Sequence, residues 1–287
     1  DETVTCHLEE NQVRLATDTV NLSLNTKDTQ EFPPFPERIE NMMQLSASDV
    51  LTMIDSVAFL IPKNNTNPAL NGVLVEINEN GMKMTATDGH CLAQAESQAY
   101  ALQEPQTWVV PRRAIFELKK IIESREEETI FLGICGNHLV FSGEGFNFFT
   151  KVLNEQFPAY EHILDKTHFT PAYIDRQAFI KTLRRATCLL SGQFIATRFT
   201  FEPNQLEVTM ENKEVGSLHE TVELPEYDGE KQEICFYAPY LINGISIFDE
   251  NTITFYVKDT VKPIIFESQR NNIAVTYLVM PVSQTNG

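Results

Sequence analysis

Stretches with a helical spacing of apolar residues are separated, along this chain, by short segments in which apolar and polar residues alternate. The first helical stretch follows Ser46, and its apolar residues recur at i, i+3, i+4 and i+7: Val50, Met53, Ile54 and Val57. Ser46 can cap the N-terminus of a helix, and Asp49 stands three residues further on, as in a capping box. The pattern therefore predicts an amphipathic helix that begins after Ser46.

Three further stretches predict helices of the same kind. One starts at Pro111, a favoured first-turn residue, and runs to about Ser124, while the others start after Asp175 and at Pro239. Their inward-facing residues are expected to be Ile115, Leu118, Ile122, Phe179, Ile180, Leu183, Leu241, Ile242 and Ile245.

Between these helices lie short segments with the period-two alternation of β-strands. Examples are residues 73–77, 82–87, 129–134, 138–142, 199–202, 206–210, 253–257 and 264–267. Turns such as Asn80-Gly81 and Pro203-Asn204 separate them. The order helix, strands, helix, strands predicts an α+β fold in which each copy packs two helices on antiparallel sheet.

The sequence also repeats itself with a period near 126 residues. Glu2-Thr3-Val4 resembles Glu128-Thr129-Ile130, and residues 110–118 resemble residues 236–244 at the same offset. A period of this length corresponds to a domain rather than to a solenoid unit. The chain therefore consists of the end of one copy followed by two whole copies, and such repeated domains commonly build a surface, an arc or a ring.

Length and composition limit the class of protein. The chain has 287 residues, of which 42% are hydrophobic, enough for a core in each of two domains of about 125 residues. No stretch offers the roughly 18 apolar residues of a membrane span, and the first residues lack the basic start and apolar stretch of a signal peptide. The five cysteines are scattered without a Cys-x-x-Cys pair, which indicates reduced, mostly buried thiols in a cytosolic protein.

The net charge of −18, taken alone, argues against binding to nucleic acid, because phosphate contacts need lysine and arginine. Two of the predicted helices nevertheless carry eight of the 22 basic residues: Arg112, Arg113, Lys119, Lys120, Arg176, Lys181, Arg184 and Arg185. Helix faces are often charged only because they are solvated, but two basic helices at comparable places also suggest a basic inner face and an acidic exterior. Since no stacking platform or base-reading motif accompanies them, any contact would be to the nucleic-acid backbone.

Five short motifs occur in order along the two complete copies. They are Pro68-Ala69-Leu70-Asn71-Gly72-Val73-Leu74, Thr85-Ala86-Thr87-Asp88-Gly89-His90-Cys91-Leu92-Ala93, Val110-Pro111-Arg112-Arg113, Phe157-Pro158-Ala159-Tyr160 and Tyr277-Leu278-Val279-Met280-Pro281-Val282. In this order and at these spacings they closely resemble the beta sliding clamp family, the beta subunits of bacterial DNA polymerase III. The resemblance covers essentially the whole chain, and the Thr-Asp-Gly-His segment and the terminal Val-Met-Pro are specific together.

The resemblance implies a subunit built of three similar domains, and it implies that two such subunits close head to tail into a ring around duplex DNA. Residues 39–164 resemble the middle domain, residues 165–287 the last domain, and residues 1–38 the end of the first. If all copies have equal length, about ninety residues of the first domain are expected to be absent. The family's contact between subunits implies an interface around Cys188, Leu189 and Leu190.

The resemblance also implies a pocket between the middle and last domains that takes a short peptide from each client protein. The matching positions are Leu70, Thr87, Gly89, His90, Cys91, Leu92, Pro158, His162, Ile163, Val279, Met280, Pro281 and Val282. Aliphatic side chains and a pliable methionine make an apolar slot that accepts Leu or Phe anchors following a Gln. Cys91 replaces a common arginine, His162 stands where a basic residue is often found, and residues 283–287 replace a common Arg-Leu ending.

The resemblance further implies a cytoplasmic processivity factor without catalysis, cofactor or metal. The expected partners are duplex DNA, the replicative polymerase alpha subunit, the clamp loader, and repair and translesion polymerases. A homodimer is expected where the first domain is complete, whereas a chain without most of it is expected to be mostly monomeric and to bind client peptides without encircling DNA. The other alternative is a hydrolase that uses Asp88 and His90, although Gly89 between them indicates a turn.

Overall fold

The chain, whose computed structural model describes residues 3–32 and 39–283, divides into two compact units. The first unit, Asp1–Ile39, contains an antiparallel sheet followed by a 3-10 helix. Its elements are β1 (Thr5–Glu9), β2 (Gln12–Ala16), β3 (Asn21–Asn25) and η1 (Thr29–Glu31). The second unit, Glu40–Gly287, contains the other elements.

One face of the three-stranded sheet is apolar. The cross-strand pairs of Cys6 with Leu15 and of Leu8 with Val13 place these side chains on one face, and Leu8 is 80% exposed. Leu139, the counterpart of Val13 in the next copy, is only 1% exposed because helices cover that face. The apolar residues of the first unit therefore occupy the positions whose counterparts face the core in the next copy.

The second unit contains one order of elements twice. The first copy is β4 (Glu40–Ser46), α1 (Ala47–Val57), η2 (Ala58–Leu60), η3 (Pro68–Leu70), β5 (Gly72–Asn78), β6 (Gly81–Thr87), β7 (Cys91–Ser97), β8 (Gln106–Pro111), α2 (Arg112–Ile122), β9 (Thr129–Cys135), β10 (His138–Gly143) and β11 (Phe146–Lys151). After η4 (Glu161–Ile163), the second copy is β12 (Thr170–Asp175), α3 (Arg176–Thr187), β13 (Thr197–Glu202), β14 (Gln205–Asn212), β15 (Gly216–Glu223), β16 (Gln232–Phe236), α4 (Ala238–Ile245), β17 (Thr252–Val257), β18 (Ile264–Arg270) and β19 (Ile273–Val279). The repeated order confirms the predicted α+β fold, whereas the predicted boundary after residue 164 stays a prediction because the unit is compact across it.

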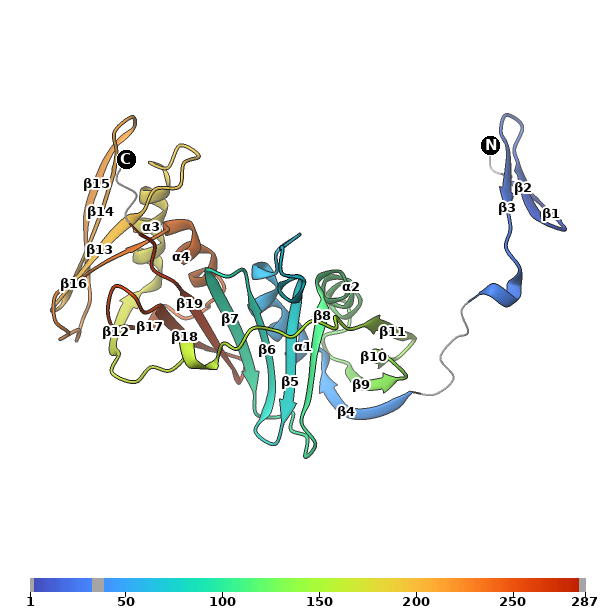
Figure 1. Ribbon diagram of the computed structural model, residues 1–287, viewed down its shortest axis with the longest axis horizontal. Helices are drawn as coiled ribbons and strands as arrows, with labels where there is room; N and C mark the ends of the chain where they lie inside the picture. The colour runs from blue at the N-terminus through green and yellow to red at the C-terminus, as the bar shows by residue number, and fades with distance from the viewer. Residues whose placement is uncertain (1–2, 33–38, 284–287) are drawn as a thin grey trace. The chain divides into compact units, whose positions relative to one another are not determined.

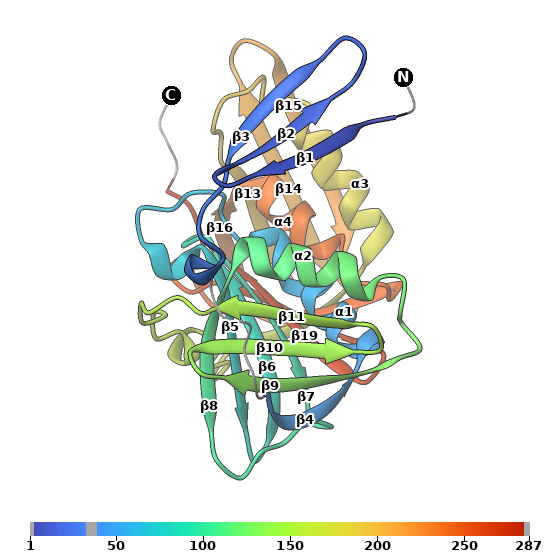
Figure 2. The ribbon, with the colours of Figure 1, turned by 90° about the vertical axis from the view of Figure 1, so that its right-hand side faces the viewer.

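An eight-stranded sheet joins the two copies (Figure 1). Its order is β12-β17-β18-β19-β7-β6-β5-β8, so the last strand of the second copy pairs with a strand of the first. The other sheets of this unit have the orders β11-β10-β9-β4 and β15-β14-β13-β16, and Figure 2 shows α2 beside the first of them. All of these strand pairs are antiparallel.

The four helices begin close to where the sequence predicts them. The Ser46 hydroxyl accepts a hydrogen bond from the Asp49 N–H at 3.5 Å, and the Asp175 carboxylate accepts one from the Ala178 N–H at 2.6 Å. The helices α2 and α4 begin within one residue of the prolines expected to open them. Every predicted inward-facing helix residue is buried except Ile242, which is half-buried. Among the described residues, none of the helices is long and apolar enough to cross a membrane.

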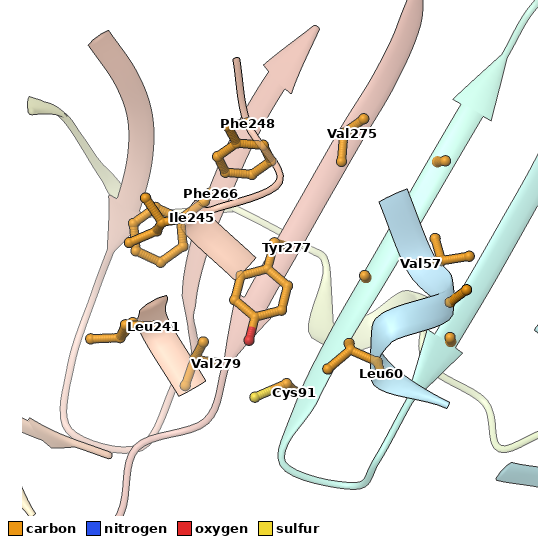
Figure 3. Close-up of a cluster of buried hydrophobic side chains, with 14 of the residues drawn as sticks. Val57, Leu60, Cys91, Leu241, Ile245, Phe248, Phe266, Val275, Tyr277 and Val279 are labelled. Atoms are coloured by element: carbon orange, nitrogen blue, oxygen red, sulfur yellow. The ribbon is translucent and has the colours of Figure 1, made fainter. Parts of the chain in front are cut away.

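The main core is continuous across the β19–β7 pair. Tyr277 of β19 is fully buried, and its hydroxyl donates a hydrogen bond to the backbone oxygen of Tyr240 in α4 at 2.7 Å. Figure 3 shows the Tyr277 hydroxyl directed toward Cys91. Gly244 permits this packing, because a Cβ atom there would lie 1.9 Å from Cε1 of the Tyr277 ring. The two copies therefore share one hydrophobic core.

Among the cysteines, only Cys91 is buried, whereas Cys6 and Cys188 are exposed and the other two are half-buried. The expectation of mostly buried thiols is therefore wrong. Burial raises the pKa of the Cys91 thiol to about 12.

Iodoacetamide at about pH 8 is expected to alkylate Cys6 and Cys188 and to leave Cys91 unmodified until the protein unfolds, because alkylation needs an accessible thiolate. Mass spectrometry of proteolytic peptides measures the three rates. Labelling of Cys91 as fast as that of Cys188 would contradict the packing of β7 against β19.

Candidate functional site

A second apolar cluster lies on the face of the eight-stranded sheet that points away from the helices. Its buried members are Leu70, Leu74, Leu92, Val109, Phe157, Tyr160, Ile265 and Leu278, and its half-buried members are Leu153, Ile163, Leu164, Phe169, Tyr256 and Met280. We call these residues the outer cluster. Four predicted pocket residues belong to it and come from four separate segments: Leu70, Leu92, Ile163 and Met280.

Strand pairing explains why this cluster forms across the two copies. Leu92 of β7 lies directly opposite Leu278 of β19 and opposite Thr87 of β6, and Leu278 lies opposite Ile265 of β18. Directly opposed residues of antiparallel strands share a face of the sheet. The row therefore combines Thr87 and Leu92 of the first copy with Ile265 and Leu278 of the second.

The turn between β6 and β7 holds Thr87, Gly89 and His90 beside the outer cluster. The Thr87 hydroxyl donates a hydrogen bond to the backbone oxygen of Cys91 at 2.6 Å, and Gly89 has a φ of 95°, which favours glycine. The backbone N–H of Met280 donates to the backbone oxygen of His90 at 2.9 Å. The turn thus fixes the position of Met280.

Two predicted pocket residues, Cys91 and Val279, do not belong to the outer cluster. They lie opposite each other on β7 and β19, but their side chains are 1% and 0% exposed in the main core. Cys91 comes directly before Leu92, and Val279 comes directly after Leu278. Successive side chains of a strand point to opposite faces, so these neighbours face opposite sides of the sheet. The prediction that they line the pocket is therefore corrected, and Cys91 cannot replace a polar rim residue.

The last two predicted positions, Pro281 and Val282, lie beside β16. The Val282 N–H donates a hydrogen bond to the backbone oxygen of Cys235 at 2.8 Å. Both residues line a hollow of about 300 Å³ together with Glu233, Cys235 and Thr260. They are half-buried and continue from Met280 along the edge of another sheet.

The segment between β11 and β12 supplies one side of the candidate site. It carries Ile163, which packs half-buried on the outer cluster, and Pro158 and His162, which are exposed. Exposed residues next to a half-buried apolar group can contact a ligand that rests on it.

A row of aromatic side chains extends from the turn, and the sequence analysis did not include it. The His90 ring stacks on Tyr240 with centroids 5.6 Å apart, Tyr240 meets Tyr237 edge to face at 5.0 Å, and Tyr237 stacks on Phe194 at 4.4 Å. Phe194 is 51% exposed. The spacing of Tyr237 and Tyr240, three residues apart at the start of a helix, is the signal that could have placed them on one face.

Asp88 and His90 are part of a hydrogen-bonded turn between β6 and β7. One Asp88 carboxylate oxygen accepts hydrogen bonds from the backbone N–H groups of His90 and Cys91, each at 2.8 Å. The His90 ring stacks on Tyr240. Within the described ranges, no group of three or more His, Cys, Asp or Glu side chains could hold a metal ion. The arrangement is that of a stabilised turn.

Two of the four predicted basic residues of α2 are paired with acidic neighbours. Lys119 contacts Asp55 at 2.7 Å and Glu123 at 3.5 Å, and Lys120 contacts Glu117 at 3.0 Å. The hydrogen bond to Asp55 is the main reason that the pKa of Lys119 is raised. Arg112 donates a hydrogen bond to the backbone oxygen of Ile61, while Arg113 is exposed.

The basic residues of α3 keep more of their charge uncompensated. Arg185 pairs with Glu220 and lowers the pKa of that carboxyl, and Arg176 donates to the backbone oxygen of Glu250 at 2.8 Å. Lys181 and Arg184 are exposed and have no ion pair among the described residues. Among the described residues, three of the four basic residues of α3 therefore lack an ion pair, compared with two of the four in α2.

The predicted interface residues lie at the end of α3 with unequal exposure. Cys188 is exposed, Leu189 is half-buried, and Leu190 is 7% exposed within the main core. Leu190 is thus held by its own chain, and only Cys188 and Leu189 are accessible.

A wider hollow of about 1030 Å³ lies on the polar face of β13, β14 and β15. Its lining includes charged residues of both signs, such as Glu207, Glu211 and Lys231. It contains none of the predicted pocket residues, and its size reflects an open sheet face rather than an apolar slot.

Comparison with known proteins shows which protein family this chain resembles. The family model described as "DNA polymerase III beta subunit, central domain" matches residues 44–159, and the model of the C-terminal domain matches residues 161–283. The chain is 25% identical over 262 residues to a beta sliding clamp of Staphylococcus aureus, covering 91% of this chain and 69% of the relative. It is 28% identical over 258 residues to that of Synechococcus elongatus, covering 88% and 68%.

Among solved structures, the DNA polymerase III subunit beta from Pseudomonas aeruginosa has the same fold. The TM-score is 0.84 at 23% identity, over 98% of this chain and 77% of that one. The two family models together span most of the described second unit. The chain therefore belongs to the DNA polymerase III beta subunit family, the beta sliding clamps.

Proposed function

We propose that the protein is a processivity factor that tethers client proteins to duplex DNA and carries out no chemistry itself. The observation that carries this proposal is the meeting of Leu70, Leu92, Ile163 and Met280 on the outer face of the joining sheet. An apolar cluster of this kind, next to the polar turn at Thr87 and His90, suits a short peptide with aliphatic and aromatic anchors.

The clients in this proposal are the replicative polymerase alpha subunit, the clamp loader, and repair and translesion polymerases. Each would offer a Gln followed by Leu or Phe anchors. Because Met280 is flexible and polarisable, the same slot can accept related but different sequences in turn. The proposed place of action is the cytoplasm.

The strand pairing supports a ring. In the second unit, the copies join where the last strand, β19, pairs with β7. By position in the repeat, β15 corresponds to β7, and β15 stands at the edge of its sheet among the described strands. The edge of β15 can therefore pair with the last strand of another copy. In a second chain, that strand would be β3, the last strand of the first copy. Two chains joined head to tail in this way, each with three complete copies, would close around DNA.

Loading a protein with three complete copies onto nicked circular duplex DNA, with a clamp loader and ATP, tests the ring. Protein retained on the circle is expected to be released when a restriction enzyme linearises the DNA, because a ring is held by topology and not by affinity. Equal retention on circular and linear DNA would contradict encirclement.

The ion pairs predict that Lys181 and Arg184 of α3 each contribute more than Lys120 of α2 to contact with duplex DNA. Replacing both Lys181 and Arg184 by alanine is expected to lower the slope of log affinity against log salt by about 2, because each residue neutralises a phosphate. Lys120→Ala should lower it by less than about 1, because Lys120 is paired with Glu117. Fluorescence anisotropy of a labelled duplex across a salt series measures both slopes, and equal changes would contradict the assignment.

A further inference from the structure

The chain between β11 and β12, residues 152–169, forms a strap across the outer face of the eight-stranded sheet. Figure 1 shows it passing in front of β8, β5, β6 and β7 on its way to β12. Its apolar side chains pack on the outer cluster: Leu153, Phe157, Ile163, Leu164 and Phe169. The strap therefore forms both a connection between copies and a wall of the candidate pocket.

One buried side chain fastens the middle of the strap to the sheet through hydrogen bonds. The Tyr160 hydroxyl donates to a carboxylate oxygen of Glu76 at 2.5 Å, and it accepts from the Gln94 amide at 3.0 Å and the Thr85 hydroxyl at 3.3 Å. Tyr160 is 5% exposed, and Phe157 meets its ring edge to face at 6.1 Å. Burial, and then the hydrogen bond to Glu76, raise the pKa of Tyr160, so the hydroxyl stays protonated and can donate.

A second attachment lies at the far end of the strap. The Lys166 ammonium group contacts a carboxylate oxygen of Glu267 at 2.5 Å and lies 4.5 Å from the centre of the Tyr256 ring. Both groups of this ion pair are about one-third exposed, so water screens it. The buried attachment at Tyr160 therefore restrains the strap more strongly.

The wall residues of the pocket are directly linked to Tyr160. Pro158 and His162 are each two positions away, and the Ile163 N–H donates a hydrogen bond to the Tyr160 backbone oxygen at 2.9 Å. A displacement of Tyr160 would thus move Ile163 relative to Leu70 and Leu92, which are fixed by η3 and β7.

We propose that Tyr160 is a positioning residue for peptide recognition, whose buried hydroxyl holds the strap in the place where Pro158, His162 and Ile163 form the pocket wall. The proposal rests on the proposed peptide-binding function and adds a residue that no peptide needs to touch. A wall that is already ordered before binding lowers the entropic cost of binding, because the peptide does not have to order the wall. Loss of the hydroxyl would leave Glu76 without its donor from the strap and free the wall to move.

The experiment compares two tyrosines that make the same kind of bond. Tyr100 also donates its hydroxyl to a carboxylate, that of Asp49, and accepts from the Ser46 N–H at 3.1 Å, but it fastens the start of α1. Tyr160→Phe and Tyr100→Phe each remove one hydroxyl and are both expected to lower the thermal midpoint. Only Tyr160→Phe is expected to weaken binding of a labelled Gln-Leu-x-Leu-Phe peptide, by about tenfold.

Two further measurements separate positioning from general destabilisation. Glu76→Gln keeps an acceptor for the Tyr160 hydroxyl and should bind the peptide within about twofold of the parent, since the hydrogen bond survives without its charge. Amide hydrogen exchange of residues 158–163, without peptide, should be faster in Tyr160→Phe and unchanged in Tyr100→Phe.

The outcomes distinguish this inference from the function on which it rests. If the parent does not bind the peptide, the proposed function and the inference fail together. If the parent binds and Met280→Ala weakens binding, but Tyr160→Phe matches Tyr100→Phe in affinity, only the inference is overturned. Faster exchange with a selective loss of affinity supports it.

Discussion

Replacing Met280 by alanine is expected to weaken binding of a Gln-Leu-x-Leu-Phe peptide about tenfold, the effect of truncating an anchor in an apolar pocket. The Met280 side chain packs half-buried on the outer cluster, and its backbone is held by His90. The substitution therefore removes contact area without releasing the strand end. A fluorescence titration with labelled peptide measures the dissociation constants of the parent and the variant.

Val261→Ala is the matched control for this substitution. Val261 is an apolar residue that is 73% exposed and lies outside the outer cluster, so its truncation should leave the affinity unchanged. Unchanged affinity in Met280→Ala as well would remove Met280 from the site and with it the pocket assignment.

Replacing Gly244 by alanine is expected to lower the free energy of unfolding by about 3 kcal/mol, the upper range for overpacking a core. A Cβ atom at this position would lie 1.9 Å from one Tyr277 ring carbon and 2.0 Å from another. The ring cannot easily move, because it is fully buried and its hydroxyl is bonded to the Tyr240 backbone. The higher helix propensity of alanine offsets only about 1 kcal/mol.

Asn243→Ala, one position earlier in α4, is the control for helix propensity. Asn243 is exposed, so this substitution should leave the thermal midpoint equal or slightly higher. Differential scanning calorimetry measures both variants. A Gly244→Ala protein as stable as Asn243→Ala would mean that α4 does not pack on β19 as described.

The helices and most local strands could be predicted from the sequence because their patterns are local. Ser46 and Asp175 cap α1 and α3, and the apolar residues at helical spacing are buried. Gly89 marks a turn because only the left-handed region of φ suits the reversal there. Each of these features depends on residues within a few positions of one another.

The pairing of β19 with β7 could not be predicted in this way. These strands are separated in sequence by most of the second unit, and the pattern of residues in each strand does not indicate which strand it pairs with. The resemblance to clamps placed Leu92 and Met280 in one pocket, but it did not distinguish the two faces of the joining strands. For that reason the predicted pocket residues included Cys91 and Val279, although strand alternation directs both side chains into the main core.

The aromatic row shows a different limit. His90 was expected at the site, but its stacking partner Tyr240 lies in a helix 150 positions further along the sequence. Tyr237 and Phe194 join the row only because α4 packs beside the segment that follows α3. Contacts of this kind arise from tertiary packing and leave no local pattern in the chain.

The central claim is that a client peptide binds on the outer cluster, where the two copies meet. Methyl NMR of the protein titrated with the Gln-Leu-x-Leu-Phe peptide tests it most directly. The methyl resonances of Leu70, Ile163 and Met280 are expected to shift with one common dissociation constant, while those of Met53 and Leu206 in the main core stay in place. Shifts confined to other surfaces, or none at saturating peptide, would contradict the claim.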